Sequence, residues 1–231
     1  MLTRRALLAA LVPAPLRVAV IAHRAAHQHH PENSLPAIEA AIALGCDYVE
    51  LDVRTTRDGQ FVLHHDATVE RGAITNLTFA DLGTPLATLD QALTLLRGRC
   101  GVYVDAKQIT APEITAALRR HDMLAHAVVY GRPALLAELT AAGHPALAMP
   151  EAVSAPILAQ TLKTLRPKVI AFDRHDFHDD VIALARQANK GIFVDRLGAD
   201  DNPAAWTDAV RRGATGIQTD RPAELIAALN R

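Results

Sequence analysis

The chain has 231 residues and a mass of 24.8 kDa, which suits one α/β barrel domain and leaves no room for a second large domain. Half of its residues are hydrophobic and only 4% are aromatic, which indicates a folded chain with an aliphatic core. The formal net charge is −1, and Lys and Arg are scattered along the sequence. Such a charge distribution argues against nucleic-acid binding.

The first 17 residues include the pair Arg4-Arg5 followed by a short apolar run, as an export signal does. This run, residues 6–12, is too short to cross a bilayer, which needs roughly 20 residues, and no other run is a candidate for a stable membrane span. The alternative is an amphipathic helix that closes the bottom of the barrel. An export signal would make the protein periplasmic or secreted, whereas the helix would leave it cytoplasmic. Residues 18–231 form the expected barrel domain.

Short apolar runs alternate with longer helical patterns along the chain, an order typical of a parallel sheet with crossover helices. Eight such strands close into a (β/α)8 barrel, whose active site lies at the carboxyl ends of the strands. The eight runs are residues 18–22, 48–53, 101–106, 127–130, 146–149, 169–172, 191–195 and 216–219. Cys46 and Cys100 each come near the start of a strand. A disulfide is conceivable if these strands are neighbours, but two buried free thiols are the expected state.

A ninth extended stretch, residues 60–64, follows the second strand through a turn at Asp58-Gly59. Asp-Gly between two extended segments favours a hairpin because glycine tolerates the positive φ of the turn. The second strand is therefore expected to rise out of the barrel, turn, and return His64, His65 and Asp66 to the catalytic face.

Polar residues occur at the predicted carboxyl ends of several strands, where a barrel carries its site residues. Glu50 and Asp52 are two apart on one strand and so point to the same side, and Asp105 ends the adjoining strand. Converging carboxylates repel each other unless a cation neutralises them, and an all-oxygen set suits Mg²⁺ or Ca²⁺ better than Zn²⁺. The alternative for each acid is an ion pair with Arg24, Arg54 or Lys107.

Two histidines, His23 and His65, are expected to face each other across that metal. Imidazole acts as acid or base near neutral pH, and phosphodiester hydrolysis needs both functions. Arg24 offers a planar fork for phosphate oxygens, and Lys107 adds a point charge. We expect His27, His29 and His30 to lie in a loop that is solvated or lines the substrate. A surface metal site is the alternative.

Several of these residues fall in ordered short motifs that resemble the glycerophosphodiester phosphodiesterase family over nearly the whole chain after residue 17. The N-terminal motifs are Ile-Ala-His-Arg from residue 21, Pro-Glu-Asn-Ser from 31, Gly-Cys-Asp-Tyr-Val-Glu-Leu-Asp-Val from 45, Thr-Arg-Asp-Gly from 56, and His-Asp from 65. The later motifs are Thr-Pro-Leu-Ala-Thr-Leu-Asp from 84, Asp-Ala-Lys from 105 and Thr-Asp-Arg-Pro from 219.

The resemblance implies a hydrolase that splits a small-molecule glycerophosphodiester into sn-glycerol 3-phosphate and an alcohol, with a divalent metal, Mg²⁺ or Ca²⁺. In the route proposed for the family, a neighbouring substrate hydroxyl attacks phosphorus, and water opens the resulting cyclic phosphate. By resemblance the catalytic pair is His23 and His65, and the metal ligands are Glu50, Asp52 and Asp105. The implied phosphate or substrate contacts are Arg24, Lys107, Glu32 and Asn33.

Four departures distinguish this chain from the family pattern. Ala25 replaces a glycine, Ser34 replaces a threonine, and Asp105 replaces a glutamate, as in the related sphingomyelin-cleaving phospholipases D. Residues 191–196 replace a tryptophan-bearing segment on the wall expected to contact the alcohol. The sequence therefore leaves the alcohol group of the substrate undetermined.

Three alternatives compete with this interpretation. A phospholipase D-like enzyme acting on lysophospholipid or sphingomyelin is favoured by Asp105 and by an export signal. Such an enzyme would need an apolar rim around the mouth of the site. The candidates are Phe61, Phe79, Phe172 and Phe177, most of which are expected in the core. A non-catalytic binding barrel is disfavoured because buried like charges are costly to retain without a metal or substrate. A metal-dependent isomerase or aldolase would lack an obvious lysine beyond Lys107, although the fold alone does not exclude it.

Overall fold

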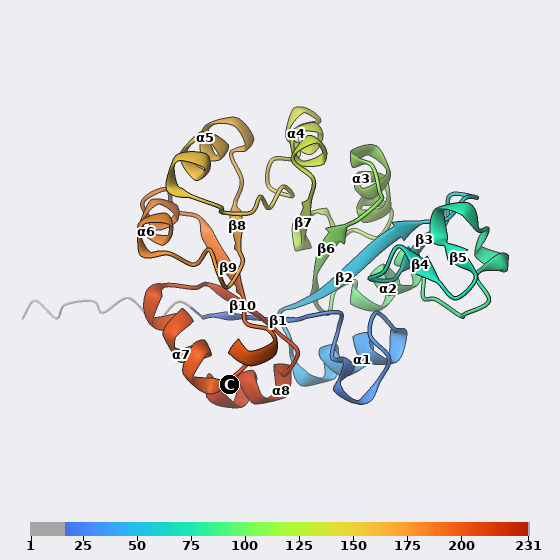
Figure 1. The fold of residues 1–231 in the computed structure, drawn as a ribbon, viewed down its shortest axis with the longest axis horizontal. Coiled ribbons are helices and arrows are strands. Elements are labelled where there is room, and N and C mark those ends of the chain that lie inside the picture. The colour runs from blue at the N-terminus through green and yellow to red at the C-terminus, as the bar shows by residue number, and fades with distance from the viewer. Residues whose placement is uncertain (1–16, 231) are drawn as a thin grey trace, which may run out of the picture.

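The computed structural model describes residues 17–230. Seven parallel strands form its main sheet: β1 (Ala19–Ala22), β2 (Tyr48–Thr55), β6 (Gly101–Ala106), β7 (Ala127–Gly131), β8 (Val169–Phe172), β9 (Gly191–Asp195) and β10 (Gly216–Thr219). They are hydrogen-bonded in the order β7-β6-β2-β1-β10-β9-β8 (Figure 1). Each coincides with a predicted run to within two residues at either end, so seven of the eight expected strands are confirmed.

The eighth expected strand, residues 146–149, is not a regular strand, and the prediction for this segment was wrong in that respect. The segment still joins β7 to β8, because Ala148 forms a parallel bridge with Val129 and Glu151 forms one with Ala171. Pro150 lies between the two bridges and has no N–H to donate, which prevents a continuous ladder. The ring of strands is nearly closed, and the fold is a single-domain (β/α)8 barrel.

Eight α-helices surround the ring of strands in the described part of the chain (Figure 1). They are α1 (Leu35–Leu44), α2 (Leu89–Leu96), α3 (Ala111–Arg120), α4 (Pro133–Ala141), α5 (Ala155–Leu165), α6 (Asp179–Gln187), α7 (Pro203–Arg212) and α8 (Pro222–Ala228). The short 3-10 helices are η1 (His27–His29), η2 (Ile74–Asn76), η3 (Phe79–Asp81), η4 (Leu124–His126) and η5 (Gly198–Asp200).

The period of two along β2 divides its side chains between two environments. Val49, Leu51 and Val53 belong to the large apolar cluster that also contains residues of the helices. Glu50 and Asp52 alternate with them and therefore face the barrel interior. Below these carboxylates the interior is filled by a separate apolar cluster, made of Ile21, Tyr103, Val128, Met149, Ala171 and Phe193.

A hairpin follows β2 as predicted. The strand β3 (Phe61–Leu63) pairs antiparallel with β2, with Leu63 opposite Val53, and Gly59 occupies the turn with a φ of +79°. The short strands β4 (Thr68–Val69) and β5 (Gly72–Ala73) form a second small sheet next along the chain. Together β3, β4 and β5 lie at one edge of the barrel, beyond the end of β2 (Figure 1).

The predicted export signal or N-terminal helix falls, apart from Arg17, outside the described residues. Within residues 17–230, no helix has the length and apolar character needed to cross a membrane. Cys46 and Cys100 are buried free thiols, as expected, and the Cys100 Sγ lies 3.2 Å from the backbone oxygen of Cys46, to which it donates a hydrogen bond.

Candidate active site

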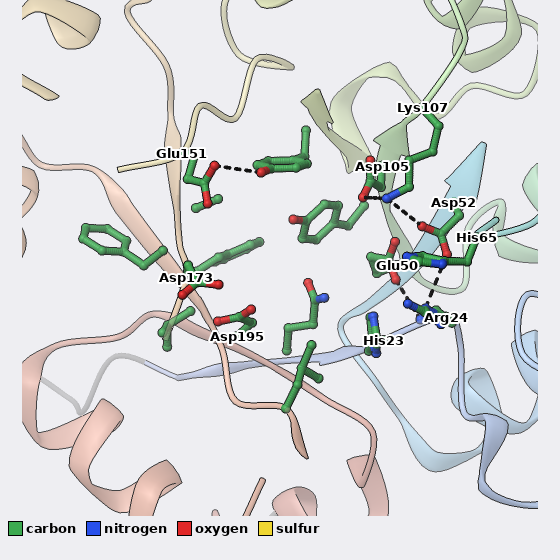
Figure 2. A pocket seen from close by; sticks show the side chains of 18 residues that line it. His23, Arg24, Glu50, Asp52, His65, Asp105, Lys107, Glu151, Asp173 and Asp195 are labelled. Carbon is green, nitrogen blue, oxygen red and sulfur yellow. Dashed lines mark hydrogen bonds and ion pairs between the residues drawn. The ribbon is translucent and has the colours of Figure 1, made fainter. Parts of the chain in front are cut away.

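An open cavity lies at the carboxyl end of the barrel (Figure 2). Both predicted histidines, all three predicted carboxylates and both predicted cationic residues line it: His23, His65, Glu50, Asp52, Asp105, Arg24 and Lys107. They come from the ends of β1, β2 and β6 and from the segment after β3. Glu32 and Asn33 do not line this cavity themselves but are hydrogen-bonded to Arg24 and Asp52, which do.

The three carboxylates form one cluster. Asp52 on β2 and Asp105 on β6 are direct neighbours in the strand register, and ligand oxygens of Glu50, Asp52 and Asp105 all lie within 4.8 Å of one another. Burial and the neighbouring Asp52 raise the pKa of Glu50 well above its usual value, and burial also raises the pKa of Asp105. This concentration of buried negative charge and oxygen donors fits a hard divalent cation.

Lys107 reaches into the same cluster. Its Nζ lies 2.7 Å from a carboxylate oxygen of Asp105 and 3.2 Å from one of Asp52. Burial alone would lower the pKa of Lys107, but these two ion pairs outweigh burial and raise it. The Arg24 Nε adds a longer ion pair with Asp52, at 3.5 Å. The ion pairs considered as the alternative to a metal are therefore formed, yet these two cations cannot balance three carboxylates.

The backbone around Arg24 is bent into the left-handed region, with φ of +48° at Arg24 and +67° at Ala25. The bend directs the backbone N–H of Arg24 to a carboxylate oxygen of Glu50 at 2.7 Å. The guanidinium donates to Glu32 at 2.9 Å, so Glu32 orients the Arg24 side chain. A positive φ also explains why glycine occupies the Ala25 position in the family pattern, since a Cβ there is strained.

The hairpin returns His65 to the cavity, as the sequence predicted. Arg54 holds this return because its Nε donates to the backbone oxygens of His64, at 3.2 Å, and His65, at 3.0 Å. Arg54 thus binds backbone carbonyls rather than the carboxylates considered as its alternative partners. The Nδ1 of His65 is hydrogen-bonded to Asp66 at 2.8 Å.

His23 has a carboxylate partner of its own, Asp220, directly after β10. The Nδ1 of His23 and the Nε2 of His27 lie 2.7 and 3.0 Å from the same oxygen of Asp220. Burial would raise the pKa of Asp220, but hydrogen bonds with both histidines outweigh burial and hold it well below its usual value. The sequence marks Asp220 as a polar strand end but gives it no function; only the fold places it against His23.

The opposite wall of the cavity carries three further acids, Glu151, Asp173 and Asp195 (Figure 2). The Tyr130 hydroxyl donates to Glu151 at 2.9 Å. Burial and the charge of Asp173 raise the pKa of Asp195 to about 6, and among the described residues the Asp195 Oδ1 has no hydrogen-bond partner. The sequence prediction missed these acids. Asp173 and Asp195 lie at strand ends, so the rule that found Asp105 applies to them too.

Comparison with known proteins connects this geometry to a family. Residues 23–92 match the model of the glycerophosphoryl diester phosphodiesterase family. A glycerophosphodiester phosphodiesterase of Caldanaerobacter subterraneus is 46% identical over 56 residues, which are 24% of this chain and 23% of that protein. One of Bacillus subtilis is 25% identical over 142 residues, 48% of each chain. The aligned segments thus span less than half of these relatives.

Solved structures match over nearly the whole chain. A glycerophosphodiester phosphodiesterase of Agrobacterium tumefaciens has a TM-score of 0.80 at 23% identity and covers 91% of this chain and 99% of its own. An Oleispira antarctica phosphodiesterase, solved with the product sn-glycerol-3-phosphate, has a TM-score of 0.78 at 18% identity, with 92% and 97% covered. The structural matches establish the fold, and the sequence matches confirm the resemblance to the family.

Proposed function

We propose that this chain, a relative of the glycerophosphodiester phosphodiesterases, hydrolyses a glycerophosphodiester to sn-glycerol 3-phosphate and an alcohol with a divalent metal. One observation carries the proposal: three clustered carboxylates, two histidines and two cationic side chains line a single cavity. Each group has a use in phosphodiester hydrolysis, and a purely structural barrel would have little use for all of them in one place.

Glu50, Asp52 and Asp105 would hold the metal, Mg²⁺ or Ca²⁺. When bound, the ion would supply positive charge that orients and neutralises the phosphoryl group. Arg24 and Lys107 would contact the remaining phosphate oxygens. Both side chains are already held by acids, Arg24 by Glu32 and Lys107 by Asp105, which limits their motion before substrate arrives.

The two histidines would divide the proton transfers. Asp220 binds the Nδ1 of His23, which leaves Nε2 free to accept the proton of the substrate hydroxyl as its oxygen attacks phosphorus. The half-buried carboxylate stabilises the imidazolium that results, so we assign His23 as the base. His65, whose partner Asp66 is exposed, would give a proton to the oxygen of the departing alcohol. These two transfers would release the alcohol and leave a cyclic phosphate. Water would then open the cyclic phosphate, with His65 accepting the proton of water and His23 returning its proton to the substrate hydroxyl.

The three acids on the opposite wall of the cavity, here called the acidic wall, affect which alcohol group the substrate can carry. Glu151, Asp173 and Asp195 lie across the cavity from the phosphate-binding side chains (Figure 2). An anionic alcohol would be repelled there, so we propose that neutral or cationic alcohols are preferred. Among the four candidate rim residues, Phe172 and Phe177 are buried in the core and Phe61 packs against it. Phe79 is exposed but does not line the cavity, so the phospholipase D-like alternative gains no support from this rim.

The test is release of glycerol 3-phosphate from glycerophosphocholine after EDTA treatment and again after addition of Mg²⁺ or Ca²⁺, with lysophosphatidylcholine as a parallel substrate. We expect turnover of the first substrate, lost with chelator and restored by metal. His23→Ala and His65→Ala should each abolish it while thermal melting still shows a folded protein. Turnover of lysophosphatidylcholine alone would favour the phospholipase D-like activity, and activity retained in either variant would remove that histidine from the mechanism.

A further inference from the structure

A second group of metal-binding side chains lies beside the carboxylate cluster. It consists of His23, His27 and Asp220, and one ligand atom of each lies within 4.8 Å of the other two. Both imidazole nitrogens converge on the same Asp220 oxygen, at 2.7 and 3.0 Å. The two rings are nearly perpendicular, at 74°, with centroids 6.3 Å apart, so they meet at their edges and do not stack.

The backbone holds all three side chains in this arrangement. His23 follows β1 directly, and its backbone N–H donates to the carbonyl of Thr219 at the end of β10. The left-handed bend at residues 24–25 then turns the chain so that His27, on η1, comes back over Asp220. Asp220 is fixed through its own N–H, which donates to buried Asp201 at 2.8 Å. All three side chains are partly exposed, so an ion from solvent can reach them.

We propose that His23, His27 and Asp220 form a binding site for Zn²⁺ or a similar borderline-soft divalent ion, separate from the carboxylate site. Two imidazole nitrogens and one carboxylate oxygen, with a remaining position for water, are a ligand set typical of zinc. The cluster of Glu50, Asp52 and Asp105 offers oxygen only and suits harder ions. The two neighbouring sites therefore differ in the class of ion that each selects.

Zinc at this site would change the protonation of His23. A neutral imidazole carries one N–H, and a metal that takes the lone pair of Nδ1 obliges that proton to reside on Nε2. His27, bound through Nε2, keeps its proton on Nδ1 in the same way. With Nε2 protonated, His23 cannot accept a proton from substrate. Zinc is therefore an inhibitor of the hydrolysis, a consequence that rests on the proposed function of His23, whereas zinc binding itself does not.

The test is calorimetric titration of Zn²⁺ into the protein in saturating Mg²⁺, with two matched variants. His27→Gln removes a proposed ligand, and His29→Gln changes an exposed histidine of the same 3-10 helix that is not part of the cluster. We expect one zinc ion per chain for the unaltered protein and for His29→Gln, and at least about tenfold weaker binding for His27→Gln. Visible absorption of bound Co²⁺, used as a substitute for zinc, should appear in the unaltered protein and in His29→Gln and be weaker in His27→Gln.

Two results would overturn the inference: equal zinc affinity in His27→Gln and the unaltered protein, or zinc binding that is lost in Glu50→Gln and kept in His27→Gln. Inhibition supplies the second readout. Zinc should inhibit Mg²⁺-dependent release of glycerol 3-phosphate in His29→Gln and leave His27→Gln active at the same concentration. If no variant hydrolyses any phosphodiester, the proposed function fails, but the binding isotherms still decide whether the zinc site exists.

Discussion

Asn33 and Asp52 hold each other through two hydrogen bonds. The Asn33 Nδ2 donates to a carboxylate oxygen of Asp52 at 2.8 Å, and the Asp52 backbone N–H donates to the Asn33 Oδ1 at 3.0 Å. Both residues are buried, so no water replaces these bonds easily. Asn33 therefore fixes the direction of a proposed metal ligand from behind, without facing the cavity.

We expect Asn33→Gly to weaken metal binding by roughly 10-fold to 100-fold, the usual cost of losing a group that orients a ligand. Glycine is the sharper choice over alanine because Asn33 has a φ of +56°, which glycine adopts without strain. The measurement is turnover as a function of Mg²⁺ concentration. Asn189→Gly is the control, since Asn189 is exposed, lies outside the cavity and has a φ of +54°. Equal metal dependence in both variants would leave Asn33 with a structural function only.

The barrel was predictable because its signals are local and repeated. Runs such as 169–172 and 191–195 are short, apolar and separated by helical patterns, and both form strands with those bounds. The segment around Pro150 could not be predicted in the same way. The apolar residues 146–149 match the pattern of a strand. Whether they pair regularly depends on the position of Pro150 relative to the two neighbouring strands, which only the tertiary structure sets.

The site was predictable where position along a strand carries the information. Glu50 and Asp52 alternate with outward apolar residues, so their common face follows from the sequence. The Asp220 contact with His23 joins residues 197 positions apart, and it depends on the closure of the barrel between β1 and β10. The contacts of Glu32 with Arg24 and of Asn33 with Asp52 depend on the left-handed bend at residues 24–25. Glycine at position 25 would have indicated such a bend, but this sequence has alanine there.

Asp220→Asn should lower kcat by about 10²-fold to 10⁴-fold with little change in KM, because the amide cannot stabilise a charged imidazole and favours the tautomer with its proton on Nε2. The measurement is the pH profile of kcat/KM on glycerophosphocholine, where the limb that reports the base should also move. Asp66→Asn serves as the matched control, since Asp66 is the exposed partner of His65. A loss of the same size in both variants would argue against a special function of the Asp220 contact.

Asp105→Glu should keep metal-dependent turnover, because the glycerophosphodiester phosphodiesterase motif has glutamate at this position and Asp105 borders the open cavity, where one more methylene can be placed. Asp105→Asn keeps the size of the side chain and removes its charge, so we expect apparent Mg²⁺ affinity to fall by at least about tenfold. Both variants are compared by Mg²⁺ titration of turnover. Normal metal affinity in Asp105→Asn would show that Asp105 pairs with Lys107 and does not bind the ion.

Asp195 should make the protein less stable as pH rises through the range from about 4 to 6. Burial and Asp173 raise the pKa of Asp195 from 3.8 to about 6, so the folded state binds the proton more tightly than the unfolded chain does. The unfolded chain therefore gains stability relative to the folded one across this range, and the cost is complete above it. A shift of about two pKa units corresponds to at most about 3 kcal/mol, which partial exposure to solvent reduces.

Thermal melting of the unaltered protein and Asp195→Asn in EDTA, between pH 4 and 8, measures this cost. The variant has no charge to bury, so we expect it to melt at the same temperature as the unaltered protein near pH 4 and several degrees higher near pH 7.5. Glu70→Gln, which changes an exposed acid between β4 and β5 outside the cavity, should melt like the unaltered protein at every pH. If Asp195→Asn instead loses stability at pH 7.5, the carboxylate has a stabilising partner in solution, and the acidic wall is not free to select the alcohol by its charge.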